Sequence, residues 1–265
     1  MDYLLDNWEE LKKRLKDKYI FVFLDYDGTL TPIVNTPQKA IISASVRLLL
    51  RKLSDNSRLK LAFISGRTLE DIKNKIRLKN VIYSGNHGLE IEGPKIKFEP
   101  LGLPKYRTIL ERIKNDLQEK MSSIRGAFLE DKGLSLSLHY RLVDKKQIPH
   151  VKTIFHETVI LYLVRNKIKI KSGKMVLEVR PPTEWDKGKV VLWLLARQQF
   201  ALGDKGVFPV YIGDDVTDED AFKVLKRRGL TVFVGKPGNS KAEYYLKNTK
   251  EVARFLRLIS GLKHN

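Results

Sequence analysis

The segment YIFVFLDYDGTL, residues 19–30, decides how the fold of this chain is interpreted. Its first six residues are apolar or aromatic, which is typical of a strand buried on both faces of a parallel sheet. Residues two apart along an extended chain point to the same side, so Asp25 and Asp27 can both face a crevice while Tyr26 turns away. Ligands of open α/β sheets bind at such strand ends, and the segment therefore predicts a binding site there.

Other short apolar runs along the chain have the same character, and most are separated by segments with helical periodicity. These runs are Leu59–Ile64, Val81–Ser84, Val207–Ile212 and Thr231–Val234. Strands that alternate with helices in this way predict an α/β fold with a doubly wound parallel-sheet core.

The stretch from about 104 to 180 has a different order of expected elements. They are a helix over Tyr106–Met121, strands over Ala127–Asp131 and Leu134–Tyr140, a helix over His150–Val164, and strands over Lys167–Ile170 and Met175–Val179. Parallel strands are expected on both sides of this stretch, so we interpret it as an inserted α+β cap at 104–180. The core would then comprise 1–103 and 181–265, with crossings near Pro100–Pro104 and Pro181–Pro182, since proline stops helices and strand ladders.

Composition narrows the classes of function. The 265 residues are 42% apolar and 31% charged, as in ordinary globular proteins, and contain no cysteine, which excludes thiolate metal sites and cysteine nucleophiles.

The chain has no long apolar run and its start lacks a signal-peptide pattern, so we expect a cytoplasmic protein without a membrane partner. The net charge of +19 favours anionic ligands. The basic residues are dispersed and no aromatic stripe accompanies them, so we expect no nucleic-acid partner.

A second acidic strand end follows the run Val207–Ile212, in the sequence GDDVTDED at 213–220. Glu219 and Asp220 are interpreted as residues that complement the dipole of the following helix. Asp214 and Asp215 precede that helix and could reach the same metal as Asp25. Adjacent carboxylates need a cation to offset their repulsion, and a hard divalent ion with oxygen ligands fits best.

Two further positions carry functional groups at expected element ends. Ser65, in Ser-Gly-Arg after the strand Leu59–Ile64, could donate its hydroxyl to a phosphate, although a plain turn has the same sequence. Lys187 lies at the expected start of an amphipathic helix, where a cation opposes the helix dipole and so suggests a functional reason. A surface lysine is the alternative, and Lys189 competes for the same role.

Taken in order, the four motifs DxDGT, Ser, Lys and acidic strand end closely resemble those of haloacid dehalogenase-like phosphatases. A narrower resemblance is to trehalose-phosphate phosphatases. It is carried by DYDGTLTPI at 25–33, GNHGLEI at 85–91, LSLHYR at 136–141, LEVRP at 177–181 and GDDVTDEDAF at 213–222. These strings are distributed along most of the chain and imply a Rossmann-like parallel-sheet core with an inserted α+β cap that selects the substrate.

The resemblance also implies roles for individual residues. Asp25 would be the nucleophile, Asp27 the general acid and base, and Ser65 and Lys187 would hold the phosphoryl oxygens. A Mg²⁺ ion would be held by Asp25, Asp27, Asp214 and Asp215. Substrate contacts would come from Gly66, Arg67, Asn86 and His87 in the core and from Lys132, His139, Arg141 and Glu178 in the cap. His139 and Arg141 would alternate along one strand and point into one cleft.

The activity that the resemblance implies is Mg²⁺-dependent hydrolysis of trehalose 6-phosphate to trehalose and phosphate through an aspartyl-phosphate, a phosphoric monoester hydrolase reaction of trehalose biosynthesis. A cap that closes over the crevice implies a small sugar phosphate as the partner, and we expect a monomer. Two alternatives stay open: a phosphatase for mannosylphosphoglycerate or sucrose 6-phosphate, and a catalytically silent binding protein.

Overall fold

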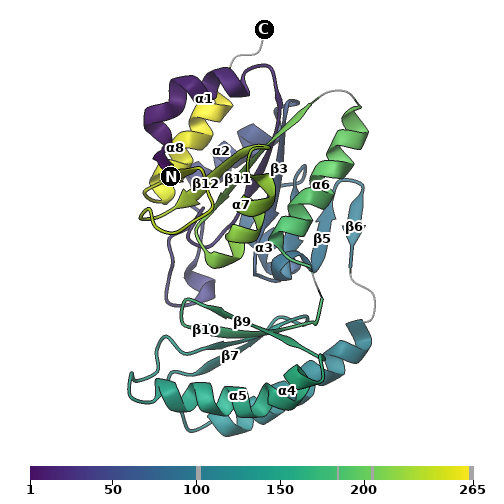
Figure 1. Ribbon diagram of the computed structural model, residues 1–265, viewed down its shortest axis with the longest axis vertical. Helices are drawn as coiled ribbons and strands as arrows, with labels where there is room; N and C mark the ends of the chain where they lie inside the picture. The colour runs from purple at the N-terminus through teal and green to yellow at the C-terminus, as the bar shows by residue number, and fades with distance from the viewer. Residues whose placement is uncertain (100–102, 184, 204–205, 263–265) are drawn as a thin grey trace. The chain divides into compact units, whose positions relative to one another are not determined.

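The computed structural model describes residues 1–99, 103–183, 185–203 and 206–262 (Figure 1). The chain divides into two compact units. The core unit comprises Met1–Phe98 and Trp185–Asn265, and the inserted unit comprises Glu99–Glu184. The expected crossing at Pro100–Pro104 falls largely on residues 100–102, which lie outside the described residues.

A nine-stranded sheet forms the centre of the core unit, in the order β1-β13-β12-β11-β2-β3-β4-β5-β6. Its strands are β1 (Asp2–Tyr3), β2 (Tyr19–Leu24), β3 (Leu59–Ile64), β4 (Ile82–Gly85), β5 (Glu90–Gly93), β6 (Ile96–Phe98), β11 (Val207–Gly213), β12 (Leu230–Val234) and β13 (Tyr244–Leu246). All neighbours from β1 to β4 in this order pair in parallel, and β5 and β6 extend the edge as antiparallel strands. The predicted parallel α/β core is confirmed, with β2 between β11 and β3.

Helices cover both faces of this sheet because its central strands are apolar on both sides. In β2, Ile20, Val22 and Leu24 pack into one hydrophobic cluster and Phe21 and Phe23 into the other. The first cluster lies under α1 (Trp8–Leu15), α2 (Ala44–Ser54), α3 (Leu69–Ile76) and α8 (Thr249–Ser260). The second lies under α6 (Lys187–Leu202) and α7 (Glu219–Leu225). Strands buried on both faces read as continuous apolar runs, which is why they were visible in the sequence.

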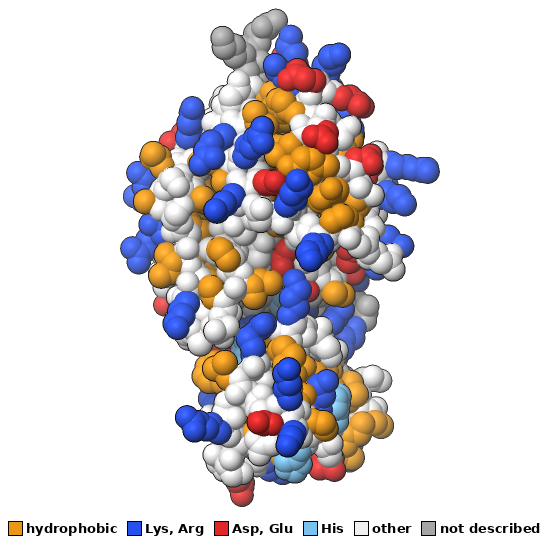
Figure 2. All heavy atoms as spheres, turned by 90° about the vertical axis from the view of Figure 1, so that its left-hand side faces the viewer, with side chains coloured by type: hydrophobic (Ala, Val, Ile, Leu, Met, Phe, Trp, Pro, Cys, Tyr) orange, Lys and Arg blue, Asp and Glu red, His pale blue; other side chains and the backbone are white. Residues whose placement is uncertain are grey.

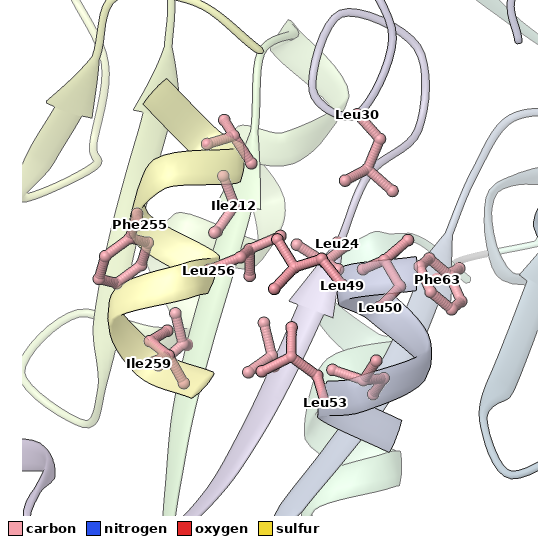
Figure 3. Packing of buried hydrophobic residues seen from close by; sticks show 14 of the residues in the cluster. Leu24, Leu30, Leu49, Leu50, Leu53, Phe63, Ile212, Phe255, Leu256 and Ile259 are labelled. Carbon is pink, nitrogen blue, oxygen red and sulfur yellow. The ribbon is translucent and has the colours of Figure 1, made fainter. Parts of the chain in front are cut away.

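The first cluster joins segments that are far apart in the sequence. Figure 3 shows Phe255, Leu256 and Ile259 of α8 opposite Leu50 and Leu53 of α2, beside the end of β2. All five side chains are essentially buried. At roughly 1.5–3 kcal/mol for each fully buried side chain of this size, such packing fixes the strand ends that carry the site.

The inserted unit has a four-stranded antiparallel sheet in the order β7-β8-β10-β9. Its elements are α4 (Leu103–Met121), β7 (Phe128–Asp131), β8 (Leu136–His139), α5 (Ile148–Val164), β9 (Lys169–Gly173) and β10 (Val176–Arg180). Leu136, Leu138 and Leu177 pack with α4 and α5 in one hydrophobic cluster, which leaves Ser137 and Glu178 on the opposite side of the pleat. The helix and strand types expected here are those observed.

The distribution of basic side chains on the surface agrees with the sequence, in which they are dispersed. Figure 2 shows Lys and Arg side chains scattered over one face of both units, with apolar and acidic side chains between them. In the described part of the chain, every helix is too short or too polar to cross a bilayer.

Candidate active site

Asp25 lies directly after β2, at the carboxyl edge of the sheet. Its backbone N–H donates to the carbonyl of Ile212 at 3.0 Å, so the pairing of β2 with β11 continues one residue past the strand. Tyr26 is buried, and its hydroxyl donates to the carbonyl of Ala40 at 3.0 Å. Asp25 is only 5% exposed, whereas the side chain of Asp27 is 42% exposed. This strand end thus presents one buried and one accessible carboxylate.

Lys187 is the first residue of α6 and is buried against two carboxylates. Its Nζ donates to Oδ1 of Asp25 at 2.8 Å and to Oδ1 of Asp218 at 2.7 Å. The side chain is 3% exposed, whereas Lys189 is exposed on the same helix. A cation at a helix start is unfavourable by itself, and the two carboxylates offset that cost. Of the two lysines considered from the sequence, Lys187 is therefore the one that reaches Asp25.

Asp218 is a site residue that the sequence interpretation missed. It is fully buried, and its Oδ2 accepts from the backbone N–H groups of Asp214 at 3.1 Å and Asp215 at 2.9 Å. Its Oδ1 accepts from Lys187 and from the Tyr211 hydroxyl, both at 2.7 Å. Asp218 thereby fixes the loop that carries Asp214. The spacing Asp214-x-x-x-Asp218 after a buried strand was the available signal.

Burial sets the protonation of this cluster. It raises the pKa of Asp25 well above its usual range; Lys187 opposes the shift, while Asp218 and Asp214 add to it. Burial alone would lower the pKa of Lys187, but the carboxylates of Asp218 and Asp25 raise it, so the amine stays protonated. Three buried carboxylates thus face one ammonium group. The site carries an excess of negative charge away from water, which is costly unless a further cation is present.

The acidic cluster fits a hard divalent cation. Asp25, Asp214 and Asp218 each offer a carboxylate oxygen, these oxygens lie within 4.8 Å of one another, and all three residues are buried. Carboxylate oxygens are the ligands that such ions prefer, and the cation would offset the excess charge.

The cluster of three buried aspartates does not include Asp27 and Asp215, the other two carboxylates expected at the metal. Asp27 accepts from Nε and Nη2 of Arg67, both at 2.7 Å. The side chain of Asp215 accepts a backbone N–H and caps the turn η4 (Val216–Asp218). The structure therefore brings Asp25 and Asp214 together with Asp218, and the roles of Asp27 and Asp215 as metal ligands stay predictions.

Two loops at neighbouring strand ends hold Ser65 and the core residues predicted to contact the substrate. Ser65, 1% exposed, follows β3, and its backbone carbonyl accepts from the N–H of His87 at 2.9 Å. The N–H of Asn86 donates to the carbonyl of Arg67 at 2.7 Å. Asn86 and His87 both have left-handed backbone angles, with φ of 49° and 56°. A Cβ on Gly66 would lie 2.4 Å from Nε2 of His87, so only glycine permits this packing.

Gly28 packs against the acidic cluster, and its replacement gives a first test. Its φ is +85°, and an added Cβ would lie 2.2 Å from Oδ2 of Asp214. Gly28→Ala is therefore expected to displace Asp214 and to weaken Mg²⁺ binding by about 10–100-fold, the range for residues that orient ligands. Isothermal titration calorimetry with MgCl₂ measures the change.

Gly133→Ala is the matched control for this prediction. Gly133 has a similar φ of +73°, but nothing lies within 4 Å of an added Cβ. Both variants carry the left-handed backbone cost of about 1–2 kcal/mol, and only the first crowds Asp214. Equal Mg²⁺ affinities in the two variants would show that Gly28 has no part in metal binding.

In the inserted unit, Lys132 lies beside Glu178, and His139 pairs with Glu130, whose Oε2 is also 3.9 Å from Nζ of Lys132. Nζ of Lys132 donates to Oε1 of Glu178 at 3.3 Å, and Nε of Arg180 donates to Oε2 at 2.6 Å. Nε2 of His139 and Oε2 of Glu130 are 2.8 Å apart. Glu178 is 5% exposed although it lies on the polar side of the sheet. This side thus carries a compact set of charged and hydrogen-bonding groups.

The expectation that His139 and Arg141 alternate along one strand is wrong. Strand β8 ends at His139, and Arg141 lies in the turn that follows. There its Nη2 donates to the carbonyl of Lys174 at 2.7 Å, so the side chain provides a hydrogen bond to the backbone of the turn after β9. Binding roles for either residue stay predictions that no longer rest on strand alternation.

A doubly wound core with the buried Asp25 at the end of β2, Lys187 beside it and an α+β insertion defines a haloacid dehalogenase-like hydrolase. A solved structure of that description from Bacteroides thetaiotaomicron has the same fold, with a TM-score of 0.61 at 20% identity over 91% of this chain and 100% of that chain. The C-terminal domain of trehalose-6-phosphate phosphatase from C. albicans is closer, with a TM-score of 0.79 at 27% identity over 95% of this chain and 98% of that one.

The sequence comparisons identify the family within this class of hydrolases. The family model described as trehalose-phosphatase matches residues 23–250. Trehalose-phosphate phosphatase B of Arabidopsis thaliana is 37% identical over 95% of this chain and 69% of its own length. Probable trehalose-phosphate phosphatase 4 of Oryza sativa is 39% identical with the same coverage. The chain belongs to the trehalose-phosphatase family.

Proposed function

We propose that this chain is a Mg²⁺-dependent phosphatase that hydrolyses trehalose 6-phosphate to trehalose and phosphate. The observation that carries the proposal is the buried carboxylate of Asp25, held by Lys187 beside two further buried aspartates, in a chain of the trehalose-phosphatase family. A carboxylate held by an ammonium group and positioned next to a cation site is suited to nucleophilic attack on phosphorus.

In the first half of the reaction, a carboxylate oxygen of Asp25 forms a bond to phosphorus and the bond from phosphorus to the sugar oxygen breaks. A sugar alkoxide is a poor leaving group, so it needs a proton as it departs. The carboxyl group of Asp27, two residues away and 42% exposed, supplies that proton. Lys187 offsets negative charge on the transferring phosphoryl group.

In the second half, water attacks phosphorus and the bond to Asp25 breaks. Asp27, now ionised, accepts a proton from the attacking water, so one carboxyl group serves as acid and then as base. Phosphate leaves, and Asp25 returns to its starting state. Lys187 stays paired with Asp218 throughout, because that carboxylate is fully buried and has no other role in the sequence of steps.

Asp25 and Asp214 would hold the Mg²⁺ ion, and Asp218, whose oxygens accept from Lys187, Tyr211 and two backbone N–H groups, would keep the loop of Asp214 in place. When bound, the ion supplies positive charge to the phosphoryl oxygens and offsets the excess of carboxylates. Ser65, Gly66, Asn86 and His87 follow β3 and β4, which neighbour β2, and we assign the remaining phosphate contacts to them. We assign the sugar contacts to the inserted unit, where Lys132, His139, Arg141 and Glu178 offer hydrogen-bonding groups suited to hydroxyls.

A substrate panel tests the proposed function. Phosphate release is measured from trehalose 6-phosphate, glucose 6-phosphate, sucrose 6-phosphate and mannosylphosphoglycerate, each with and without Mg²⁺. We expect Mg²⁺-dependent release with a clear preference in kcat/KM for trehalose 6-phosphate, since a site built to hydrogen-bond one sugar rejects another that leaves its buried polar groups unpaired. Preference for another sugar overturns the proposed substrate, and no release from any of them overturns the proposed activity.

A variant of the inserted unit completes the panel. Glu178→Gln keeps the size of a residue that four protein donors contact and removes its charge. We expect it to raise KM for trehalose 6-phosphate about tenfold or more, the effect of losing one good hydrogen bond to a charged group. An unchanged KM would remove Glu178 from the sugar-binding residues.

A further inference from the structure

Arg67 follows Ser65 by two residues, but its guanidinium group is turned into the protein. The side chain is only 7% exposed. Nε donates to Oδ2 of Asp27 and Nη2 donates to Oδ1, both at 2.7 Å. Two parallel bonds of this kind match the guanidinium fork to the carboxylate and fix both the direction and the plane of the carboxyl group.

The guanidinium group is itself held on its other sides. Nη1 donates to Oδ2 of Asp71 at 2.5 Å, and Nη2 also donates to the carbonyl of Pro37 at 2.8 Å. Its central carbon lies 5.2 Å from the centre of the Tyr26 ring, a distance typical of a cation–π contact. All three nitrogens of Arg67 thus donate to protein oxygens, and Asp27 is fixed through them to α3 and to the turn η2 (Pro37–Lys39).

We propose that Arg67 is a positioning residue for the hydrolysis: it holds the carboxylate of Asp27 where that group accepts a proton from the attacking water. This inference rests on the proposed function. It differs from the substrate contact expected for Arg67 from the sequence, because its nitrogens are already engaged by protein groups. Asp27 is partly exposed and rotates about two side-chain bonds, so without Arg67 it would lose its orientation, to which proton transfer is sensitive.

Arg67→Gly and Arg67→Lys test the inference. We expect kcat for trehalose 6-phosphate to fall by about 10²-fold or more in both, with KM changed by less than about threefold, since the contribution of a positioned base is lost while binding is kept. Lysine keeps the charge but lacks the fork. Added ethylguanidinium is expected to restore part of kcat in Arg67→Gly and to have no effect on Arg67→Lys, whose side chain fills the space.

A double-mutant cycle separates positioning from general support of the fold. In an Asp27→Asn background there is no carboxyl group to position, so Arg67→Gly should cost little further activity. Lys75→Met is the matched control. Nζ of Lys75 donates to the carbonyls of Ala40 at 3.0 Å and Gln38 at 3.4 Å, so it holds the same segment as Arg67 without touching Asp27.

The outcomes distinguish the inference from the proposed function. If the wild-type protein releases phosphate and Arg67→Gly loses no more kcat than Lys75→Met, or loses equally in the Asp27→Asn background, Arg67 is not a positioning residue. A KM rise with kcat unchanged would make Arg67 a substrate ligand instead. If the wild type acts only on another phosphomonoester, the proposed substrate fails and the same cycle is run on that compound. A wild type without any phosphatase activity overturns both.

Discussion

Asp25→Asn is expected to abolish phosphate release, with a loss of about 10⁵-fold or more in kcat, as for the removal of other enzyme nucleophiles. An amide cannot form the covalent bond to phosphorus that the carboxylate forms. The substitution keeps the size of a residue that is 5% exposed, and Lys187 keeps its partner Asp218 at 2.7 Å. The variant should therefore fold normally, which a thermal melt would check.

Direct detection of the aspartyl-phosphate intermediate would show that the lost activity reflects loss of the nucleophile. Wild-type protein mixed with substrate and quenched in acid should gain the mass of one phosphoryl group on the peptide that carries Asp25, and the variant should gain none. Turnover within about a hundredfold of wild type in Asp25→Asn would exclude this residue as the nucleophile.

Lys187→Met is expected to have the largest effect on stability. It leaves Asp25 and Asp218 buried without their shared ammonium group, from which they are 2.8 and 2.7 Å away. Removing one partner of a buried ion pair costs roughly 3–5 kcal/mol of unfolding free energy. The pKa of Asp25 is already raised by burial, and loss of Lys187 should raise it further, so the destabilisation should grow as pH rises through that pKa.

Denaturant melts of the metal-free protein between pH 5 and 8 measure this effect. Saturating Mg²⁺ should recover part of the lost stability, because the ion binds the carboxylates only in the folded state. Lys189→Met is the matched control, since Lys189 lies two residues further along the same helix and is exposed. A Lys187 variant as stable as this control at every pH would contradict the charge balance inferred for the cluster.

The strands of the core could be predicted because burial on both faces leaves a continuous apolar run. The observed bounds of β2 and β3 equal the expected ones, and β11 is one residue longer. The strand β13 was not predicted. It spans only Tyr244–Leu246 and is defined by its pairing with β12, a long-range contact with no periodicity in the sequence to indicate it.

The candidate site also has residues that the sequence predicts and one that it does not. Asp25 and Asp214 were identified because each follows an apolar strand, and their carboxylates lie in one cluster in the structure. Asp218 was overlooked because acids after a strand also suit a helix start, and nothing local distinguishes the two uses. The structure shows that Asp218 serves both, since it accepts two backbone N–H groups and also Lys187. Its role depends on a residue 31 positions away, which no local pattern contains.

The split of the core unit around the insertion has a consequence for synthesis on the ribosome. Strand β2 lies between β3, made early, and β11, made only after the inserted unit. A nascent chain that ends before residue 185 carries Asp25 but lacks Lys187, Asp214 and the strand that covers one edge of the apolar β2. An uncovered edge of this kind pairs readily with other chains. Premature termination should therefore yield inactive and aggregation-prone fragments, and correct assembly waits for the last third of the polypeptide.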